Sequence, residues 1–167
     1  PRFSHRTGGD LDKARLVAAL QLTVRGVPFL YYGEEIGMEN HDIPLHEGLD
    51  PVAARFRFMP QWLVAWMRGH GILLNRDECR APMQWTDGPN AGFAPEGVKP
   101  WLPVHPRSHA LNVASQEQDA TSLLRCYRAL LALRRGHPAR QMGSLEWIEA
   151  PSLPEDVVAY RRVLGEG

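Results

Sequence analysis

A short apolar run between two glycines constrains the fold of this chain more than any other feature. Residues Val27 to Tyr32 are all apolar or aromatic, and Gly26 and Gly33 bound them. Such a run is typical of a strand that is buried on both faces, as in a parallel sheet covered by helices. A helical pattern comes directly before it, and a helix followed by a buried strand predicts an α/β protein.

The preceding helix is predicted from about Leu11 to Arg25. Leu16, Leu20 and Val24 recur at four-residue spacing, which places them on one face of a helix. Asp10 is a suitable N-cap, and the glycine after Arg25 is a suitable C-terminal stop.

Regular elements return near the end of the chain. A second helix is predicted from about Thr121 to Arg135, with Asp119 as a cap and Gly136 as its end. Two strand-like segments follow, at about Ser144 to Glu149 and Val157 to Val163. Strands that come after the last helix indicate the beginning of a small β domain.

Residues 33–120 lie between these elements and show little periodicity. A loop this long inside a compact domain is usually functional. One helix is predicted within it, from Gln61 to Arg68, because Trp62, Leu63 and Trp66 lie on neighbouring turns.

Composition excludes several kinds of partner. The chain contains 19 Lys and Arg residues and 19 Asp and Glu residues, so its formal net charge is zero. We expect no nucleic-acid partner and no membrane partner, because there is no basic stripe and no apolar run near the ~20 residues of a membrane helix. Two cysteines, Cys79 and Cys126, favour free thiols in a reducing cytoplasm, with a single bridge as the alternative.

Two His-acid pairs are candidate metal ligands, His41-Asp42 and His46-Glu47. Both lie in a polar loop without a further ligand in evidence, so we expect no metal site.

Glu34 and Glu35 follow the expected strand directly. In a barrel of parallel strands, residues at this position face the active site, which suggests a catalytic acid pair. Adjacent side chains of an extended chain point in opposite directions, however, so the two cannot flank one bond. A structural role, such as pairing with an arginine or capping loop amides, is the better interpretation.

Arg80 lies in a proline-containing segment from Arg76 to Trp85. The planar fork of arginine suits it to gripping oxygen atoms. A loop salt bridge to Asp77 or Asp87 explains this residue equally well.

Large aromatic side chains in the irregular region offer faces on which a sugar could stack, although the anchoring of irregular segments explains each one more simply. They are Trp62, Trp66, Trp85, Trp101 and Phe93. The chain has no Ser-His-Asp order and no phosphate-binding glycine loop. The residues alone therefore predict an α/β piece with a functional loop, and no particular reaction.

A series of motifs runs through nearly the whole chain. It comprises Phe29 to Met38, Cys79 to Trp85, Pro89 to Phe93, Lys99 to Val104, Leu111 to Ala114, Tyr127 to Arg134 and Val157 to Tyr160. In content and order, these motifs resemble those of the α-glucosidases and oligo-1,6-glucosidases of glycoside hydrolase family 13, the α-amylase superfamily. The first resembles the eighth barrel strand of that family, and the second resembles its Arg-Thr-Pro-Met-Gln-Trp motif.

The resemblance implies a fold. Residues 1–140 would be the C-terminal part of a (β/α)8 barrel, and residues 141–167 the beginning of a small β domain. Members of the family are retaining glycosidases in which two carboxyl groups flank the scissile bond. In the family these groups and a third Asp lie upstream of the segment that begins at Pro1. We therefore expect a fragment of a longer enzyme that contains no catalytic residue.

Two arginines are candidate substrate-binding residues by the same resemblance. Arg80 matches the position that grips the non-reducing-end glucose, which accounts for exo action. Arg2 matches a position near the neighbouring subsite, because Pro1-Arg2 agrees with the end of the family's Asn-His-Asp-Gln-Pro-Arg motif.

The chain departs from the family pattern near Arg80. The segment from Gln61 to Asn75 is longer than the usual loop and would lie at the rim of the site, so acceptor and linkage preference stay open. Glu78 replaces the usual Gly, Ala81 replaces the usual Thr, and either change could shift the Arg80 segment.

The resemblance predicts a fragment of an exo-acting retaining α-glucosidase that hydrolyses maltose- or isomaltose-type oligosaccharides. The expected partner is a small oligosaccharide, no cofactor is expected, and the expected location is cytoplasmic. We expect the chain itself to be inactive. The alternatives are a trehalose synthase-type glucosyl isomerase, a catalytically dead homologue and a truncated chain without a function. The oligomeric state does not follow from the sequence.

Overall fold

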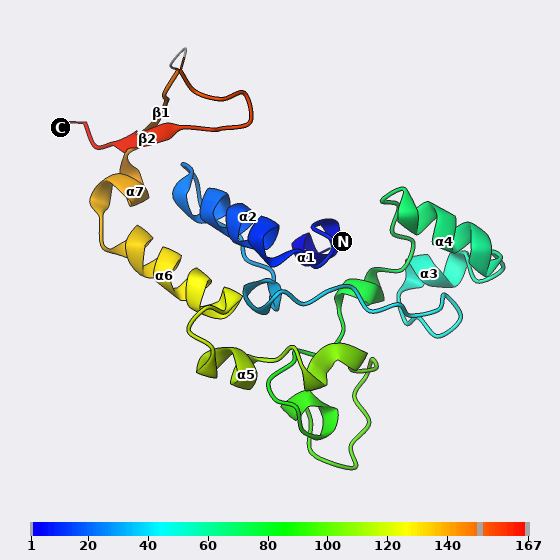
Figure 1. Ribbon diagram of the computed structural model, residues 1–167. Coiled ribbons are helices and arrows are strands. Elements are labelled where there is room, and N and C mark those ends of the chain that lie inside the picture. Colours follow the sequence, from blue (N-terminus) through cyan, green and yellow to red (C-terminus); the bar gives the residue numbers. More distant parts are fainter. Residues whose placement is uncertain (1, 150–151, 166–167) are drawn as a thin grey trace.

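The computed structural model describes residues 2–149 and 152–165. Short helices joined by long connections make up most of it, and a two-stranded sheet lies near the C-terminal end (Figure 1). The helices are α1 (Phe3–Arg6), α2 (Leu11–Thr23), α3 (Pro51–Arg55), α4 (Gln61–Gly69), α5 (Val113–Gln118), α6 (Leu123–Arg135) and α7 (Pro138–Met142). The strands are β1 (Ser144–Trp147) and β2 (Tyr160–Val163), and the 3₁₀ turns are η1 (Glu34–Ile36), η2 (Arg76–Cys79), η3 (Pro89–Gly92) and η4 (Pro106–His109). None of the described helices is long and apolar enough to cross a membrane.

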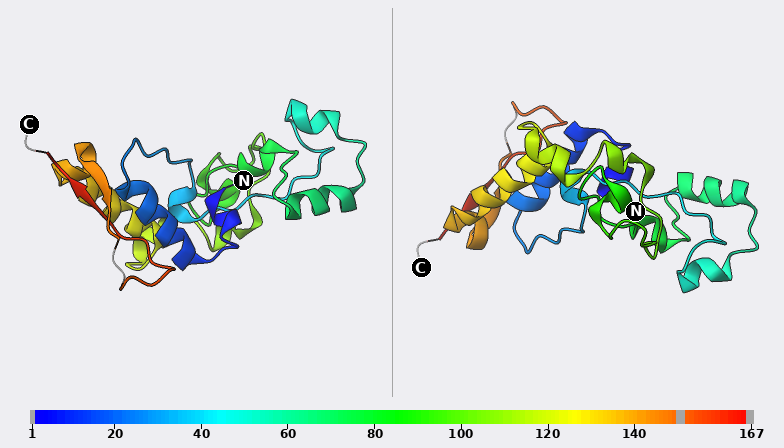
Figure 2. Two further views of the ribbon diagram at one scale, coloured as in Figure 1. Left: turned by 90° about the horizontal axis from the view of Figure 1, so that it is seen from above. Right: turned by 90° about the horizontal axis from the view of Figure 1, so that it is seen from below.

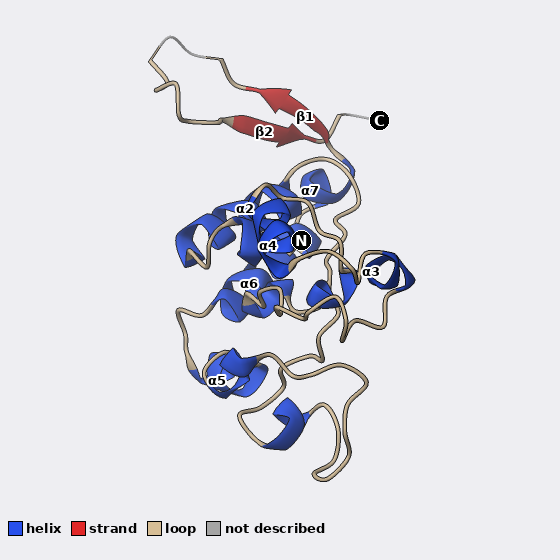
Figure 3. Ribbon diagram, turned by 90° about the vertical axis from the view of Figure 1, so that its right-hand side faces the viewer, coloured by secondary structure: helices blue, strands red, loops and turns tan. Residues whose placement is uncertain are grey.

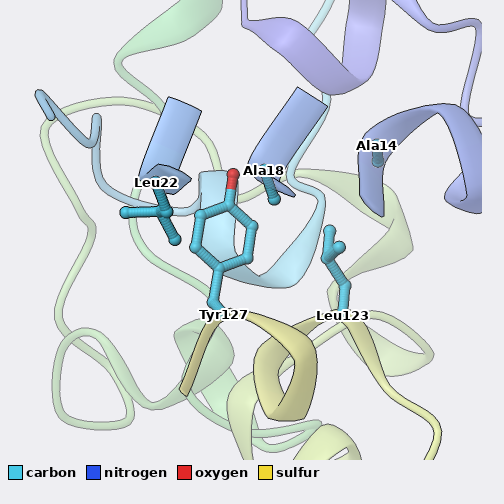
Figure 4. Packing of buried hydrophobic residues seen from close by; sticks show 5 residues of the cluster. All are labelled: Ala14, Ala18, Leu22, Leu123 and Tyr127. Carbon is cyan, nitrogen blue, oxygen red and sulfur yellow. The ribbon is translucent and has the colours of Figure 1, made fainter. Parts of the chain in front are cut away.

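Helices α2 and α6 lie side by side and enclose an apolar core (Figures 1 and 4). The small side chains of Ala14 and Ala18 leave room for α6 to approach α2 closely. Leu22 of α2 fills the space beside Leu123 and Tyr127 of α6, and all of these residues are buried. Fully burying a side chain of the size of Leu22 contributes about 1.5–3 kcal/mol, so this contact is a main source of stability.

Helix α2 agrees with its prediction at its start and differs at its exposed face. The side chain of Asp10 accepts hydrogen bonds from the amides of the first turn, as expected of an N-cap. The helix ends at Thr23, slightly before the predicted Arg25. Leu16 and Leu20 were predicted to form the apolar face but are 61% and 37% exposed. The contact with α6 uses the alanine-bearing face of α2, so these leucines point away from that core.

Helix α6 is confirmed, with a different cap. The hydroxyl oxygen of Ser122 accepts a hydrogen bond from the amide of Arg125. The predicted cap, Asp119, is wrong, because its carboxylate accepts the amide of Thr121 in the turn that comes before the helix. Gly136 is the C-cap, as predicted.

Residues 27–32 do not form the predicted buried strand. Val27 and Phe29 are 79% and 84% exposed, and no strand is assigned to this segment. A strand in a parallel sheet exists only through hydrogen bonds to neighbouring strands. Within residues 2–149 and 152–165 no segment pairs with it, since the ladder that is present joins β1 to β2. The prediction of a formed strand is therefore wrong for this structure.

Strands β1 and β2 form an antiparallel hairpin at one end of the molecule (Figure 3). Ser144 lies opposite Val163, and Trp147 lies opposite Tyr160. The hairpin confirms both predicted strands, although each is shorter than expected. Arg162 attaches it to the helices by donating from Nη1 to a carbonyl oxygen at the C-terminal end of α2, at 3.1 Å.

Residues 43–74, here named the α3–α4 lobe, project from the rest of the chain (Figure 2). The lobe has a small apolar cluster of its own, built on Leu45, Ala53 and Val64. Helix α4 confirms the helix predicted within the irregular region. That region is therefore a set of short helices and 3₁₀ turns with connections between them, rather than one continuous loop.

Candidate functional site

An open cavity of about 350 Å³ is the candidate site, and we name it the aromatic pocket. It forms where η1, the segment after η2 and the connections on either side of η3 come together. Aromatic rings supply much of its wall, and a carboxylate and a guanidinium are also present. The lining residues are Tyr32, Glu35, Arg80, Pro82, Met83, Trp85, Phe93 and Trp101.

Arg80 is both a pocket residue and a partner in a salt bridge. Its Nη1 lies 3.5 Å from Oδ1 of Asp77, and its side chain is 37% exposed. Asp77 is buried, and its other carboxylate oxygen accepts the amides of Leu49 and Asp50 at 2.6 and 2.8 Å. The predicted salt bridge to Asp77 is therefore confirmed, whereas the predicted binding of oxygen atoms by Arg80 stays a prediction. Arg80 pairs with the buried Asp77 and also lines the cavity.

The adjacent carboxylates Glu34 and Glu35 have different surroundings, although they lie in a 3₁₀ turn and not on the extended chain that the prediction assumed. The turn η1 lies between Gly33 and Gly37, both with positive φ (83° and 76°), where a side chain would be strained. Glu34 is buried and accepts the amide of Tyr31 at 3.2 Å, which confirms the predicted capping of a loop amide. Burial raises the pKa of Glu34 above its ordinary value of 4.5. Glu35 lines the aromatic pocket.

Arg2 is buried behind the pocket rather than in its wall. Its Nη2 donates to the carbonyl of Cys79 at 2.8 Å, and its Nη1 donates to the carbonyl of Tyr32. Its guanidinium carbon also lies 4.6 Å from the centre of the Tyr32 ring. In this structure Arg2 joins two segments that carry pocket residues. Its predicted part in substrate binding stays a prediction, and Pro1 lies outside the described residues.

Tyr32 is a pocket residue that the sequence analysis assigned only to a strand. Its hydroxyl donates to the carbonyl of Ala81 at 3.0 Å, which ties the segment before η1 to the Arg80 segment. Partial burial raises the pKa of Tyr32 to about 12, so the hydroxyl stays protonated and remains a donor at neutral pH. The doubled tyrosine at the end of an apolar run was the available signal, because a buried Tyr hydroxyl usually finds a partner.

A left-handed turn places two aromatic rings of the pocket. Asn90 and Ala91 have φ of 51° and 54°, values that are uncommon for residues other than glycine. The carbonyl of Ala91 accepts the amides of Trp85 and Thr86 at 2.9 and 3.1 Å. The side-chain amide of Asn90 donates to backbone carbonyls of the following loop at 2.8 Å. Backbone strain of this kind persists only where the surroundings hold it, and it is often found at functional sites.

The other predicted candidates do not reach the pocket. Trp62 and Trp66 lie on α4 and are 71% and 56% exposed. His41 contacts a backbone carbonyl, and Asp42 pairs with Arg68. Among the described residues no group of three or more His, Cys, Asp and Glu side chains gathers to hold a metal ion.

Comparison with known proteins relates this chain to carbohydrate-active enzymes. The family described as "Alpha amylase, catalytic domain" matches residues 1–143. A probable oligo-1,6-glucosidase of Bacillus subtilis (strain 168) is 32% identical over 163 residues, which is 90% of this chain and 27% of that protein. The oligo-1,6-glucosidase of Parageobacillus thermoglucosidasius is 32% identical over 180 residues, which is 99% of this chain and 30% of that protein.

A solved structure agrees with these matches. The trehalulose synthase MutB from Pseudomonas mesoacidophila MX-45 is 34% identical with a TM-score of 0.73, over 90% of this chain and 27% of MutB. An inactive double mutant of MutB, with the same identity and TM-score over 91% of this chain and 28% of that one, was solved in complex with isomaltulose. The chain spans 27% to 30% of the length of these relatives.

Proposed function

This chain belongs to the α-amylase catalytic-domain family, glycoside hydrolase family 13, and from that premise we propose that the protein of which it forms part is an exo-acting retaining α-glucosidase. Family membership confirms the predicted fold class, part of a (β/α)8 barrel. The division between barrel and β domain at residue 140 remains a prediction.

The aromatic pocket is the observation that carries this proposal. A sugar presents apolar C–H faces and hydroxyl groups, so a fitting site combines aromatic walls with a few placed polar groups. Trp85, Phe93 and Trp101 supply the walls, and Arg80 supplies a fork of donors held by Asp77. In this proposal Arg80 binds hydroxyls of the terminal glucose of a maltose- or isomaltose-type oligosaccharide.

The catalytic carboxyl groups, in this proposal, come from outside the chain. Retaining hydrolysis needs two carboxyl groups about 5–5.5 Å apart on either side of the bond. Among the residues that line the pocket Glu35 is the one carboxylate, and Glu34 is engaged with a backbone amide. The complete enzyme would therefore supply a nucleophile and an acid from other segments. The thiols of Cys79 and Cys126 are free, which is in keeping with a reducing, cytoplasmic location.

The experiment that tests this proposal compares two proteins. The complete protein and the 167-residue chain are each incubated with p-nitrophenyl α-glucoside. We expect release of p-nitrophenol by the complete protein and none by the chain. Turnover by the chain would show that the missing carboxyl groups are not needed, and a complete protein without turnover would favour a catalytically dead homologue.

A second candidate function has a specific observation in its favour. The trehalulose synthase MutB shares 34% of aligned residues with this chain, as much as the glucosidases do. An isomerase would transfer the bound glucosyl group to a sugar instead of to water. An isomerase yields a new disaccharide of unchanged mass, whereas a hydrolase yields free glucose, so the products distinguish the two.

A further inference from the structure

Helix α4 of the α3–α4 lobe is joined to the Arg80 segment by a charged contact. The Nη2 of Arg68, near the C-terminal end of α4, lies 2.9 Å from Oε1 of Glu78 and 2.7 Å from Oδ1 of Asp42. One guanidinium therefore bridges two carboxylates, each from a segment outside the lobe. Glu78 and the segment that bears α4 are two of the three places, with Ala81, where the sequence is predicted to depart from the family pattern beside Arg80.

The two carboxylates differ in how much they depend on Arg68. The side chain of Asp42 is 73% exposed, so water can solvate its charge, whereas that of Glu78 is 2% exposed. A buried carboxylate needs a paired cation, and removing one partner of a buried pair is strongly unfavourable. Burial raises the pKa of Glu78, and the charge of Arg68 opposes that rise. Glu78 therefore depends on Arg68 more than Asp42 does, although its contact is slightly longer.

Glu78 is also close to the pocket along the backbone. It belongs to η2, whose C-cap is Arg80, and the amide of Arg80 donates to the carbonyl of Asp77 at 2.9 Å. The carbonyl of Glu78 accepts the amide of His41 at 2.7 Å. Any movement of the Glu78 side chain that shifts η2 therefore also shifts the backbone of Arg80.

Other anchors keep η2 folded without α4. The carboxylate of Asp50 binds Nε and Nη2 of Arg76, each at 2.7 Å, and the side chain of Asn75 accepts the amide of Asp77. These contacts do not involve Arg68. A variant at Arg68 should consequently retain the turn while losing the constraint on Glu78.

We propose that Arg68 and Glu78 are positioning residues of the aromatic pocket, through which helix α4 sets the position of Arg80 against the terminal sugar. The inference rests on the proposed function of Arg80. It makes α4, which lies in the segment predicted to be longer than the usual family loop, a determinant of how tightly the terminal glucose is held.

The test uses variants of the complete protein and p-nitrophenyl α-glucoside. We expect R68M and E78Q each to raise KM by about tenfold, the size of coupling typical of contacting charged residues, with kcat changed less than about threefold. R68K should retain most of the wild-type KM. In the double variant R68M/E78Q, KM should rise by less than the product of the two single-variant rises. The reason is that E78Q removes the buried charge that R68M alone leaves without a partner.

Two matched controls separate positioning from general disturbance. D42N removes the exposed carboxylate of the same arginine, and R55M removes an exposed arginine of the same lobe. Both should keep the wild-type KM, since exposed ion pairs contribute little. A purely structural role for Arg68 would lower the amount of active enzyme, and hence kcat, and leave KM unchanged. That result, or an equal rise of KM in R55M, would overturn the proposal.

Glucose binding, measured by calorimetry on the same proteins, separates this inference from the proposed function. If the wild-type protein binds glucose without hydrolysing the substrate, the proposed hydrolase fails, and the ratio of dissociation constants between wild type and R68M still decides the positioning role. A larger Kd for glucose in R68M, with an unchanged Kd in R55M, supports the positioning role. A wild-type protein that neither hydrolyses nor binds glucose overturns both.

Discussion

At the scale of single residues, charges held by buried partners organise the aromatic pocket. Asp77 holds Arg80 from one side, and Arg2 ties the Tyr32 and Cys79 segments together from behind. Arg80 could be predicted from the sequence because its segment resembles a known motif. The pairing of Arg68 with Glu78 could not be predicted, because the two residues lie on different elements and only the folded chain brings them together.

The role of Arg80 predicts a specific kinetic effect. In the complete protein, R80M should raise KM for p-nitrophenyl α-glucoside by about tenfold to about a hundredfold. This range corresponds to losing a hydrogen bond to a charged group, worth about 1.5–3 kcal/mol. The KM of R80K should lie between those of the wild type and R80M, because lysine keeps the charge and loses the planar fork. An R80M variant with a wild-type KM would remove Arg80 from the site.

The buried Asp50 predicts a pH-dependent stability. The bidentate contact with Arg76 holds the pKa of Asp50 well below its ordinary value of 3.8. A lowered folded-state pKa means that the stabilisation is present above pH 3.8 and is lost as the pH falls below it. D50N should therefore lower the free energy of unfolding of the complete protein by about 2 kcal/mol at neutral pH, and the difference from wild type should shrink in acid.

Urea unfolding at a series of pH values measures this difference. The control is D12N, which removes a carboxylate that is exposed on α2 and should leave stability nearly unchanged. A D50N deficit that stays constant into strong acid would contradict the assignment to the Asp50 charge.

At the scale of elements, local interactions were predictable and pairing between distant segments was not. Asp10, Gly136 and the helix period correctly indicated α2 and α6, because caps and periodicity act within a few residues. The prediction of Asp119 as the N-cap of α6 is wrong by three positions, because Ser122 can also accept a helix amide and is the residue that does so. Residues 27–32 carry the composition of a strand, but a strand also needs neighbours, and composition does not supply them.

The left-handed turn at η3 is the element that most directly shapes the pocket. N90A should lower the stability of the complete protein by about 1–2 kcal/mol, because alanine tolerates φ of 51° less well and lacks the amide that donates to the carbonyls of Pro95 and Val98. KM should rise as well, since the turn places Trp85 and Phe93. Thermal unfolding and steady-state kinetics measure the two effects.

A91G is the matched control for that variant. Glycine removes the penalty of a positive φ at position 91 and keeps the carbonyl that accepts the amide of Trp85. Stability equal to or above wild type is expected. If A91G lost as much stability as N90A, the strain of the turn would not be the cause.

At the scale of the whole molecule, family membership explains features that the chain alone does not. The chain spans 27% to 30% of its relatives, and an open part of a (β/α)8 barrel leaves sheet-forming segments without partners. The large exposure of Val27 and Phe29 agrees with this. Family and fold class followed from ordered motifs, whereas the choice between hydrolysis and glucosyl transfer did not. That choice depends on the acceptor side of the site, and the prediction that the segment from Gln61 to Asn75 lies at its rim stays a prediction.

Product analysis of the complete protein with maltose and with isomaltose tests the central claim most directly. Reaction mixtures are separated by chromatography, and each product is identified by mass and by comparison with standards. We expect free glucose as the main product, with its formation strongly reduced in R80M at low substrate concentration. A main product that is a disaccharide isomer of the substrate, or the absence of any product, would contradict the central claim.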